Sequence, residues 1–305
     1  MKTENGTQRD VYTIVTDRIL KQLDKGVIPW HQPWASSGPP RNLITKRMYR
    51  GINLWLLLTF NYPKNFFITQ KQLKDIGATP KEKETPALVV YWNWKEAKDE
   101  TSGEVKLIPF LRYYRVFNID QCEGIPSEIV PEDYTRVNNP IAACEKVVLE
   151  MPIKPEIKHK ENRAFYNPLE DWVNMPRMKF FENPESYYSV LFHELLHSTG
   201  HASRVGRKEI LEMQEFGSEA YSIEELTAEM GSCYLQSHCG IVINEFENNA
   251  SYINGWIGKL KNDKRFIIHA SGKAQQAVDF ILNLRLPEKE KDAVLDETST
   301  SEVVL

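Results

Sequence analysis

Two histidines four residues apart constrain this chain more than any other feature of its sequence. They begin and end the segment His193-Glu194-Leu195-Leu196-His197, which lies in an otherwise apolar stretch. Residues at positions i and i+4 lie on one face of an α-helix, so the two imidazoles can reach a single metal ion. Glu194 follows His193 directly and can act on water near that ion without ligating it. The spacing therefore predicts a helix that carries two metal ligands and a general base on one turn.

The residues around this segment predict both ends of the helix. Asn183 and Pro184 precede it, and proline is tolerated in a first helical turn. Gly200 follows at the position where a left-handed residue often ends a helix. Two histidines and a glutamate are unfavourable to bury unless they are coordinated or paired. We therefore favour an active-site helix over an ordinary core helix with partly exposed histidines.

A third metal ligand is expected downstream of the two histidines. Catalytic zinc sites use three protein ligands and leave one position open. The residue six positions after His197, where a metzincin has its third histidine, is Ser203. Glu225 and Glu229 lie four apart near the start of a second predicted helix. We predict Glu225 as the ligand and Glu229 as the carboxylate that orients a ligand histidine. The reverse assignment stays open, and so does a capping box formed by Ser222 and Glu225.

Length and composition predict a two-domain protein that does not enter a membrane. The chain has 305 residues, of which 41% are hydrophobic and 26% charged. No apolar run approaches the ~18 residues of a membrane span, and the N-terminus lacks the apolar core of a signal peptide. The four cysteines form no C-x-x-C pair, which indicates free thiols in a reducing compartment. We expect a cytoplasmic protein.

The two halves of the chain carry opposite charge. Residues 1–125 hold 19 Lys and Arg against 13 Asp and Glu, a net +6, so the total of −4 leaves −10 for the remainder. Residues 25–74 contain no acidic residue, although they include many cations and aromatic residues. Cations that follow phosphates and rings that stack on bases are typical of single-stranded DNA binding. Each ring taken singly is more often part of a core, but neither a core nor a fold requires the absence of acids.

Candidate DNA-binding residues combine these cations with aromatic side chains. The segment 29–34 contains two prolines that exclude a helix, so we expect an exposed loop that carries two tryptophans. The candidates are Trp30, Trp34, Arg41, Lys46, Arg47, Tyr49, Arg50, Lys71, Lys74, Arg112 and Arg115.

Periodicity and turn residues predict an α+β fold. In the basic half we expect helices over residues 11–23, 52–59 and 69–76, and strands over 87–92 and 106–117 separated by a turn-rich segment at 95–103. In the acidic half we expect a helix from Pro140 to about Met151, capped by Asn139, and short strands at 156–159, 164–166 and 171–175. After the two helices that bear the candidate ligands, we expect helices at 247–260 and 271–284.

Several separate segments resemble the ArdC antirestriction family of conjugative plasmids and other mobile elements. These are Ile28-Pro29-Trp30-x-x-Pro33-Trp34, Arg41-Asn42-Leu43-Ile44-Thr45, Tyr49-Arg50-Gly51-Ile52-Asn53, Val116-Phe117-Asn118-x-x-Gln121-Cys122-x-Gly124, His193 to His201, and Glu224-Glu225-Leu226-x-Ala228-Glu229. The resemblance implies an N-terminal domain that binds single-stranded DNA and a C-terminal zincin-like metallopeptidase domain. It also implies protection of incoming DNA from host restriction.

These observations together predict the domain organisation. We expect a basic single-stranded-DNA-binding domain at 1–125, a linker at 126–139, a zincin-like domain at 140–286 and a disordered tail at 287–305. In the second domain, the H-E-x-x-H helix should pack on a small sheet.

Three functions are compatible with this organisation. The first is a gluzincin-like metallopeptidase that is tethered to DNA and cleaves a protein such as a host restriction component. In this enzyme Glu194 would be the catalytic base. Zn²⁺, or another divalent ion such as Mn²⁺, would bind to His193, His197 and Glu225. The second is a single-stranded-DNA-binding protein whose metal site is structural or vestigial. An intact general base and the absence of a fourth predicted ligand favour the first. A metal-dependent nuclease is disfavoured, because the predicted metal domain is acidic and would repel DNA.

Overall fold

The computed structural model describes residues 10–31, 38–60, 62–98, 105–131, 139–211, 219–241 and 250–284. These residues form two compact units, one from residues 10–22 and 38–131 and the other from residues 23–31 and 139–284. The N-terminal part of the chain thus contributes a short segment to the second unit, which a division at 126–139 does not anticipate. The predicted tail at 287–305 and residues 132–138 of the predicted linker lie outside the described residues.

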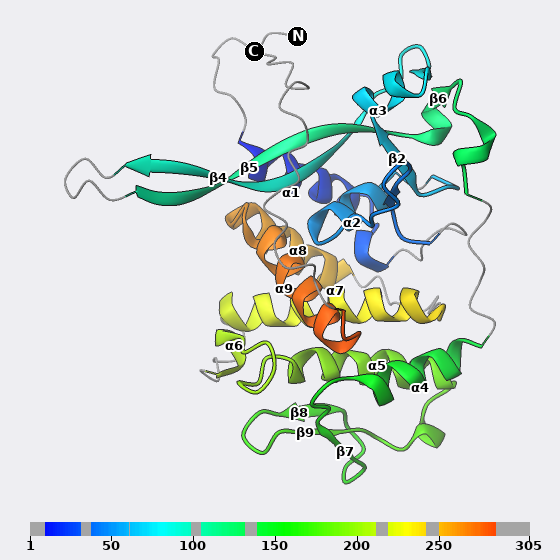
Figure 1. Ribbon diagram of the computed structural model, residues 1–305. Helices are drawn as coiled ribbons and strands as arrows, with labels where there is room; N and C mark the ends of the chain where they lie inside the picture. The colour runs from blue at the N-terminus through cyan, green and yellow to red at the C-terminus, as the bar shows by residue number, and fades with distance from the viewer. Residues whose placement is uncertain are drawn as a thin grey trace. The chain divides into compact units, whose positions relative to one another are not determined.

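The first unit is built on a four-stranded sheet with the order β1-β2-β5-β4 (Figure 1). The strands are β1 (Arg41–Asn42), β2 (Phe66–Thr69), β4 (Ala87–Lys98) and β5 (Val105–Asn118). Strands β1 and β2 are parallel, and the other neighbours are antiparallel. A two-stranded sheet joins β3 (Thr79–Pro80) and β6 (Cys122–Glu123). The helical elements are α1 (Val11–Leu23), α2 (Ile52–Leu58), α3 (Gln70–Asp75), η2 (Ile119–Gln121) and η3 (Ser127–Ile129).

The predicted helices of this unit are confirmed, but the expected turn at 95–103 is wrong in its first part. Strand β4 continues to Lys98, which pairs with Val105 of β5. The charged residues Lys95, Glu96 and Lys98 are the reason to expect a turn. The aromatic residues before them favour a strand, and the pairing of β4 with β5 continues through the charged residues.

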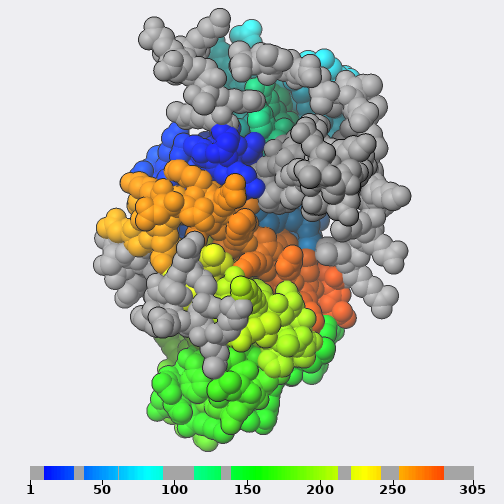
Figure 2. All heavy atoms as spheres, turned by 90° about the vertical axis from the view of Figure 1, so that its left-hand side faces the viewer, coloured from blue at the N-terminus to red at the C-terminus, as the bar shows by residue number. Residues whose placement is uncertain are grey.

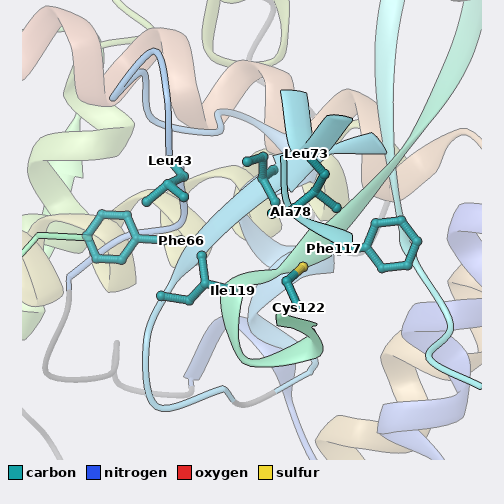
Figure 3. Packing of buried hydrophobic residues seen from close by; sticks show 8 residues of the cluster. Leu43, Phe66, Leu73, Ala78, Phe117, Ile119 and Cys122 are labelled. Atoms are coloured by element: carbon teal, nitrogen blue, oxygen red, sulfur yellow. The ribbon is translucent and has the colours of Figure 1, made fainter. Parts of the chain in front are cut away.

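Two groups of buried side chains stabilise the first unit. One joins Leu43, Phe66 and Ile68 of β2, Leu73 of α3 and Phe117 at the end of β5 (Figure 3). Helix α3 begins at a capping box in which Thr69 accepts from the backbone N–H of Gln72. The other group surrounds Phe67 on the opposite face of β2 and includes Tyr49, Leu57, Ala87, Val89 and Val116. The sheet is therefore covered on both faces.

The second unit places helices on one side of a small sheet. The strands are β7 (Glu156–Lys158), β9 (Trp172–Asn174) and β8 (Phe165–Asn167), in the order β7-β9-β8. The helical elements are η1 (Pro29–His31), α4 (Pro140–Glu150), η4 (Met178–Phe180), α5 (Pro184–Ser198), α6 (Lys208–Leu211), α7 (Glu219–Cys239), α8 (Ala250–Asn262) and α9 (Phe266–Ile281). Helix α5 lies between the sheet and α7 (Figure 1). In the space-filling view, the green atoms, which include those of the small sheet, lie directly against yellow-green atoms (Figure 2).

This architecture confirms the predicted α+β fold with an H-E-x-x-H helix on a small sheet. Asn139 caps α4, as the sequence predicts, and Asn183 caps α5 directly before Pro184. Among the described residues, no helix has the length and apolar character needed to cross a membrane. All four cysteines are free and buried.

Two glycines serve helix packing. Gly200 was expected to be left-handed, and this is wrong, because the glycines with positive φ do not include it. A Cβ atom on Gly200 would instead overlap the side chain of Ile210. On α7, a Cβ atom on Gly231 would lie 2.5 Å from Cδ1 of Leu196. Helices α5 and α7 can therefore approach closely beside the two histidines.

Candidate metal centre and nucleic-acid surface

Helices α5 and α7 bring the three predicted metal ligands together. The Nε2 atoms of His193 and His197 are 3.1 Å apart. The Glu225 carboxylate reaches both, at 3.6 Å from Nε2 of His193 and 3.7 Å from Nε2 of His197. Two histidines come from one turn of α5, and the glutamate comes from the facing turn of α7.

The spacing of these donor atoms fits one divalent ion. Ligands that share a tetrahedral ion at roughly 2.0–2.1 Å lie about 3.3 Å from one another. All three donor atoms, two imidazole nitrogens and a carboxylate oxygen, lie within 4.8 Å of each other. Nitrogen and oxygen donors in this combination suit zinc and other first-row divalent metals. His193, His197 and Glu225 are thus the residues that would hold the ion.

Glu194 occupies a buried position beside this cluster. Its side chain is 8% exposed, and both histidines and Glu225 are close enough to act on its charge. Burial raises the pKa of Glu194 above its usual value, although the imidazoles of His197 and His193 act in the opposite direction. A buried carboxylate directly beside the candidate metal ligands is placed to exchange a proton with a water molecule bound there.

Glu224, rather than the predicted Glu229, contacts one of the two candidate ligand histidines. Its Oε1 atom lies 3.0 Å from Nδ1 of His197. Nδ1 therefore carries the proton that the carboxylate accepts, and the lone pair of Nε2 faces the other ligands. Arg207 donates to the same carboxylate at 2.8 and 2.5 Å. Burial acts to raise the pKa of Glu224, but Arg207 and His197 outweigh it and lower the pKa to about 2.

The capping-box alternative for Glu225 is wrong. Helix α7 begins at Glu219, so Ser222 lies inside the helix and is not its N-cap. The hydroxyl of Tyr221, one turn before Glu225, hydrogen-bonds to the Glu225 carboxylate. Sequence reasoning missed Tyr221, although its i, i+4 spacing from Glu225 could have suggested the contact.

Glu229 lies one turn beyond Glu225 and accepts a hydrogen bond from the indole N–H of Trp30 at 2.7 Å. Trp30 is 1% exposed and belongs to the second unit. The expectation of an exposed Trp30 is therefore wrong. The physical reason is that Pro29 to His31 form a short 3₁₀ turn packed on α7, and the turn buries the ring.

The remaining candidate DNA-binding residues whose side chains the structure describes lie in the first unit, in different environments. Tyr49 is buried, and its ring packs edge-on against Phe67, so it belongs to the core. Arg41 and Arg50 are half-buried. Trp34 and the side chain of Arg112 lie outside the described residues. The exposed candidates are Lys46, Arg47, Lys71, Lys74 and Arg115.

Two exposed rings near Arg115 were not among the candidates. Tyr91 on β4 and Tyr113 on β5 are 40% and 41% exposed. The ring of Tyr91 also packs edge-on against Tyr114. The run Arg112-Tyr113-Tyr114-Arg115 contains this signal, since alternate residues of a strand point to opposite faces.

Each of the two units overlaps a family model that matches the chain. Residues 9–117 match a family model described as the N-terminal domain of anti-restriction factor ArdC, and residues 143–273 match a zincin-like metallopeptidase model. The metal-free crystal structure of the antirestriction protein ArdC from plasmid R388 is 34% identical, with a TM-score of 0.73 over 90% of this chain and 97% of that one. The chain belongs to the ArdC antirestriction family.

Two further relatives extend the comparison for this ArdC-family protein. The Mn(II)-bound structure of the R388 protein is 32% identical, with a TM-score of 0.72 over 90% of this chain and 98% of that one. A DNA primase TraC from Escherichia coli is 31% identical over 88% of this chain. The chain spans 26% of the length of that primase.

Proposed function

We propose that this protein binds single-stranded DNA through its first unit and hydrolyses peptide bonds at the metal centre of its second unit. In this proposal it acts in the cytoplasm and protects the DNA of a mobile element on entry into a host. The observation that carries the proposal is the buried Glu194 carboxylate beside His193, His197 and Glu225. A purely structural metal site has no use for such a base, and it is usually closed by four protein ligands.

The ion is proposed to be Zn²⁺, with Mn²⁺ or another divalent metal as the alternative. The Mn(II)-bound structure of the R388 relative supports a divalent ion. Such an ion, when bound, would act as a Lewis acid toward a peptide carbonyl and toward water.

The residues of the chain supply the remaining chemistry. Glu194 takes a proton from the attacking water and delivers it to the leaving amine. Glu224 accepts the Nδ1 proton of His197 and so keeps the other ring nitrogen directed at the ligand cluster. Arg207 holds Glu224 ionised and in place.

The DNA partner is supported by charge and by family. Residues 25–74 contain no acidic residue, and Lys46, Arg47, Lys71 and Lys74 are exposed within them. The match to the ArdC N-terminal model covers this stretch. The proposed protein substrate is a host restriction component that DNA binding would bring close to the metal centre.

The test is proteolysis by the purified full-length protein loaded with zinc or manganese. Restriction enzyme subunits would be incubated with it, with and without a single-stranded oligonucleotide, and products identified by mass spectrometry. We expect metal-dependent cleavage that His193→Ala abolishes. Intact subunits under all these conditions, together with tight DNA binding, would contradict the proposal and support a binding protein with a structural metal.

A further inference from the structure

A hollow adjoins the metal centre in the groove between α5 and α7. Its volume is about 220 Å³, and His193 is one of the residues that line it. The Nε2 atom of His193 faces Glu225 and His197, so the hollow begins next to the proposed catalytic ion. A peptide held at that ion would have a side chain within reach of this space.

The lining of the hollow carries one kind of charge. Of the lining residues that the structure describes, Glu229 alone has a carboxylate, while Ser189, Ser232, Cys233 and Gln236 are neutral. Ser232 donates to the backbone oxygen of Ser189 at 3.0 Å, and Gln236 donates to the Ser232 hydroxyl at 3.0 Å. The Ser232 hydroxyl and the Gln236 amide thus already have partners within the lining. Glu229 is the lining residue whose charge would select a ligand.

Trp30 fixes the orientation of this carboxylate. Its buried indole N–H donates to Oε1 of Glu229 at 2.7 Å. An indole N–H is a neutral donor, so this bond orients Glu229 and leaves its negative charge in place. A carboxylate has about four lone-pair sites and can accept further donors alongside the indole.

We infer that this hollow is a substrate subsite that selects a lysine or arginine side chain beside the scissile bond. A cationic head group would form a charge-assisted hydrogen bond with Glu229, and its aliphatic stem would occupy the hollow. The inference rests on the proposed peptidase function and adds the chemical class of the substrate residue. Trp30 is a positioning residue for this selection.

The test measures binding without turnover, in the full-length Glu194→Gln variant loaded with zinc. Two peptides that differ only in a central lysine or norleucine would be titrated calorimetrically. We expect the lysine peptide to bind at least about tenfold more tightly, as for a hydrogen bond to a charged group. Adding Glu229→Gln should remove this difference, whereas adding the exposed Glu182→Gln should retain it.

The remaining outcomes of this titration would each show whether Glu229 selects a basic side chain. Equal affinities, no binding of either peptide, or a lysine preference that survives Glu229→Gln would overturn the inference. If Glu229→Gln lowers the melting temperature, Ser189→Lys provides a second route, because its ammonium group should compete with the lysine peptide and not with norleucine.

Selective binding without cleavage by the parent protein would contradict the peptidase proposal alone. Cleavage without a basic preference would contradict the subsite alone.

Discussion

The Nδ1 atom of His197 lies 3.0 Å from Oε1 of Glu224, on the side of the imidazole opposite His193, with which it forms the proposed metal site. Arg207 is 4% exposed and donates to both oxygens of the same carboxylate. This buried chain of three residues fixes the tautomer of one ligand and couples the loop after α5 to α7.

Glu224→Gln should weaken metal binding while the fold is retained. A glutamine can still accept the Nδ1 proton, but it loses the charge that makes the imidazole a better ligand. Loss of such a partner usually lowers metal affinity by about 10–100-fold, and we expect the lower end. Competition with a chromophoric chelator measures the affinity, with Glu182→Gln as the control. Unchanged affinity would show that Glu224 has only a structural role.

The sequence predicts the ligand set more readily than its surroundings. His193 and His197 follow from their i, i+4 spacing on one helix. For the third ligand, spacing alone leaves Glu225 and Glu229 as alternatives. Glu224 adjoins Glu225 in the chain, and its role depends on Arg207, which arrives through a loop whose path the spacing does not determine. Glu229 has the right spacing from Glu225, yet it meets Trp30, which is 199 positions away.

Gly231→Ala should destabilise the second unit. Its Cβ atom would lie 2.5 Å from Cδ1 and 2.8 Å from Cγ of the buried Leu196. Overpacking of this kind costs about 1–3 kcal/mol in the free energy of unfolding. The matched control is Gly272→Ala on α9, where a Cβ atom meets nothing within 4 Å. Denaturant titration should show the control neutral or stabilised by ~0.5–1 kcal/mol, and equal effects of both variants would contradict the packing argument.

Asp171→Asn should destabilise the protein at neutral pH and less so in acid. Arg204 donates to Asp171 at 2.7 and 2.9 Å, and Tyr166 donates at 2.9 Å. Partial burial acts to raise the pKa of Asp171, but the bonds from Arg204 and Tyr166 outweigh it and hold the pKa below its usual value. Asparagine tolerates the left-handed backbone found at this position, φ 54°.

The sign of the pH dependence follows from this lowered pKa. The stabilisation is complete above the unfolded-state pKa of about 3.9 and is lost as pH falls through the folded-state value. The difference in unfolding free energy between parent and variant should therefore narrow below about pH 4. Glu156→Gln, which removes the ion pair between the exposed Glu156 carboxylate and Lys158, should have little effect. A difference that is constant with pH would show that ionisation of Asp171 is irrelevant.

Lys71→Ala and Lys74→Ala together should weaken single-stranded DNA binding. Both ammonium groups are exposed on α3 in the acid-free stretch. Each phosphate contact removed should reduce the slope of log affinity against log salt by about 0.7. Full-length protein is required, because residues 23–31 pack in the second unit. Lys146→Ala on α4 is the control, and identical slopes for the parent and the double variant would place the DNA elsewhere.

The aromatic candidates show where composition fails as a guide. Trp30 and Tyr49 lie in the acid-free stretch 25–74, but both rings are buried. The ring of Tyr49 packs in the apolar group around Phe67. Tyr91 and Tyr113, which are exposed, lie instead on the β4–β5 hairpin. Single-residue composition cannot separate these cases, since burial depends on which face of a strand or turn meets the rest of the unit.

Glu194→Gln separates peptide hydrolysis from DNA binding as the basis of antirestriction. Transfer of unmodified DNA into a restricting host would be measured for the parent, for Glu194→Gln and for the Lys71→Ala, Lys74→Ala double variant, with metal content and DNA affinity determined for each purified protein. We predict that Glu194→Gln keeps its metal and its DNA affinity but loses protection. Full protection by Glu194→Gln, with loss of protection in the double variant, would contradict it and show that antirestriction depends on DNA binding alone.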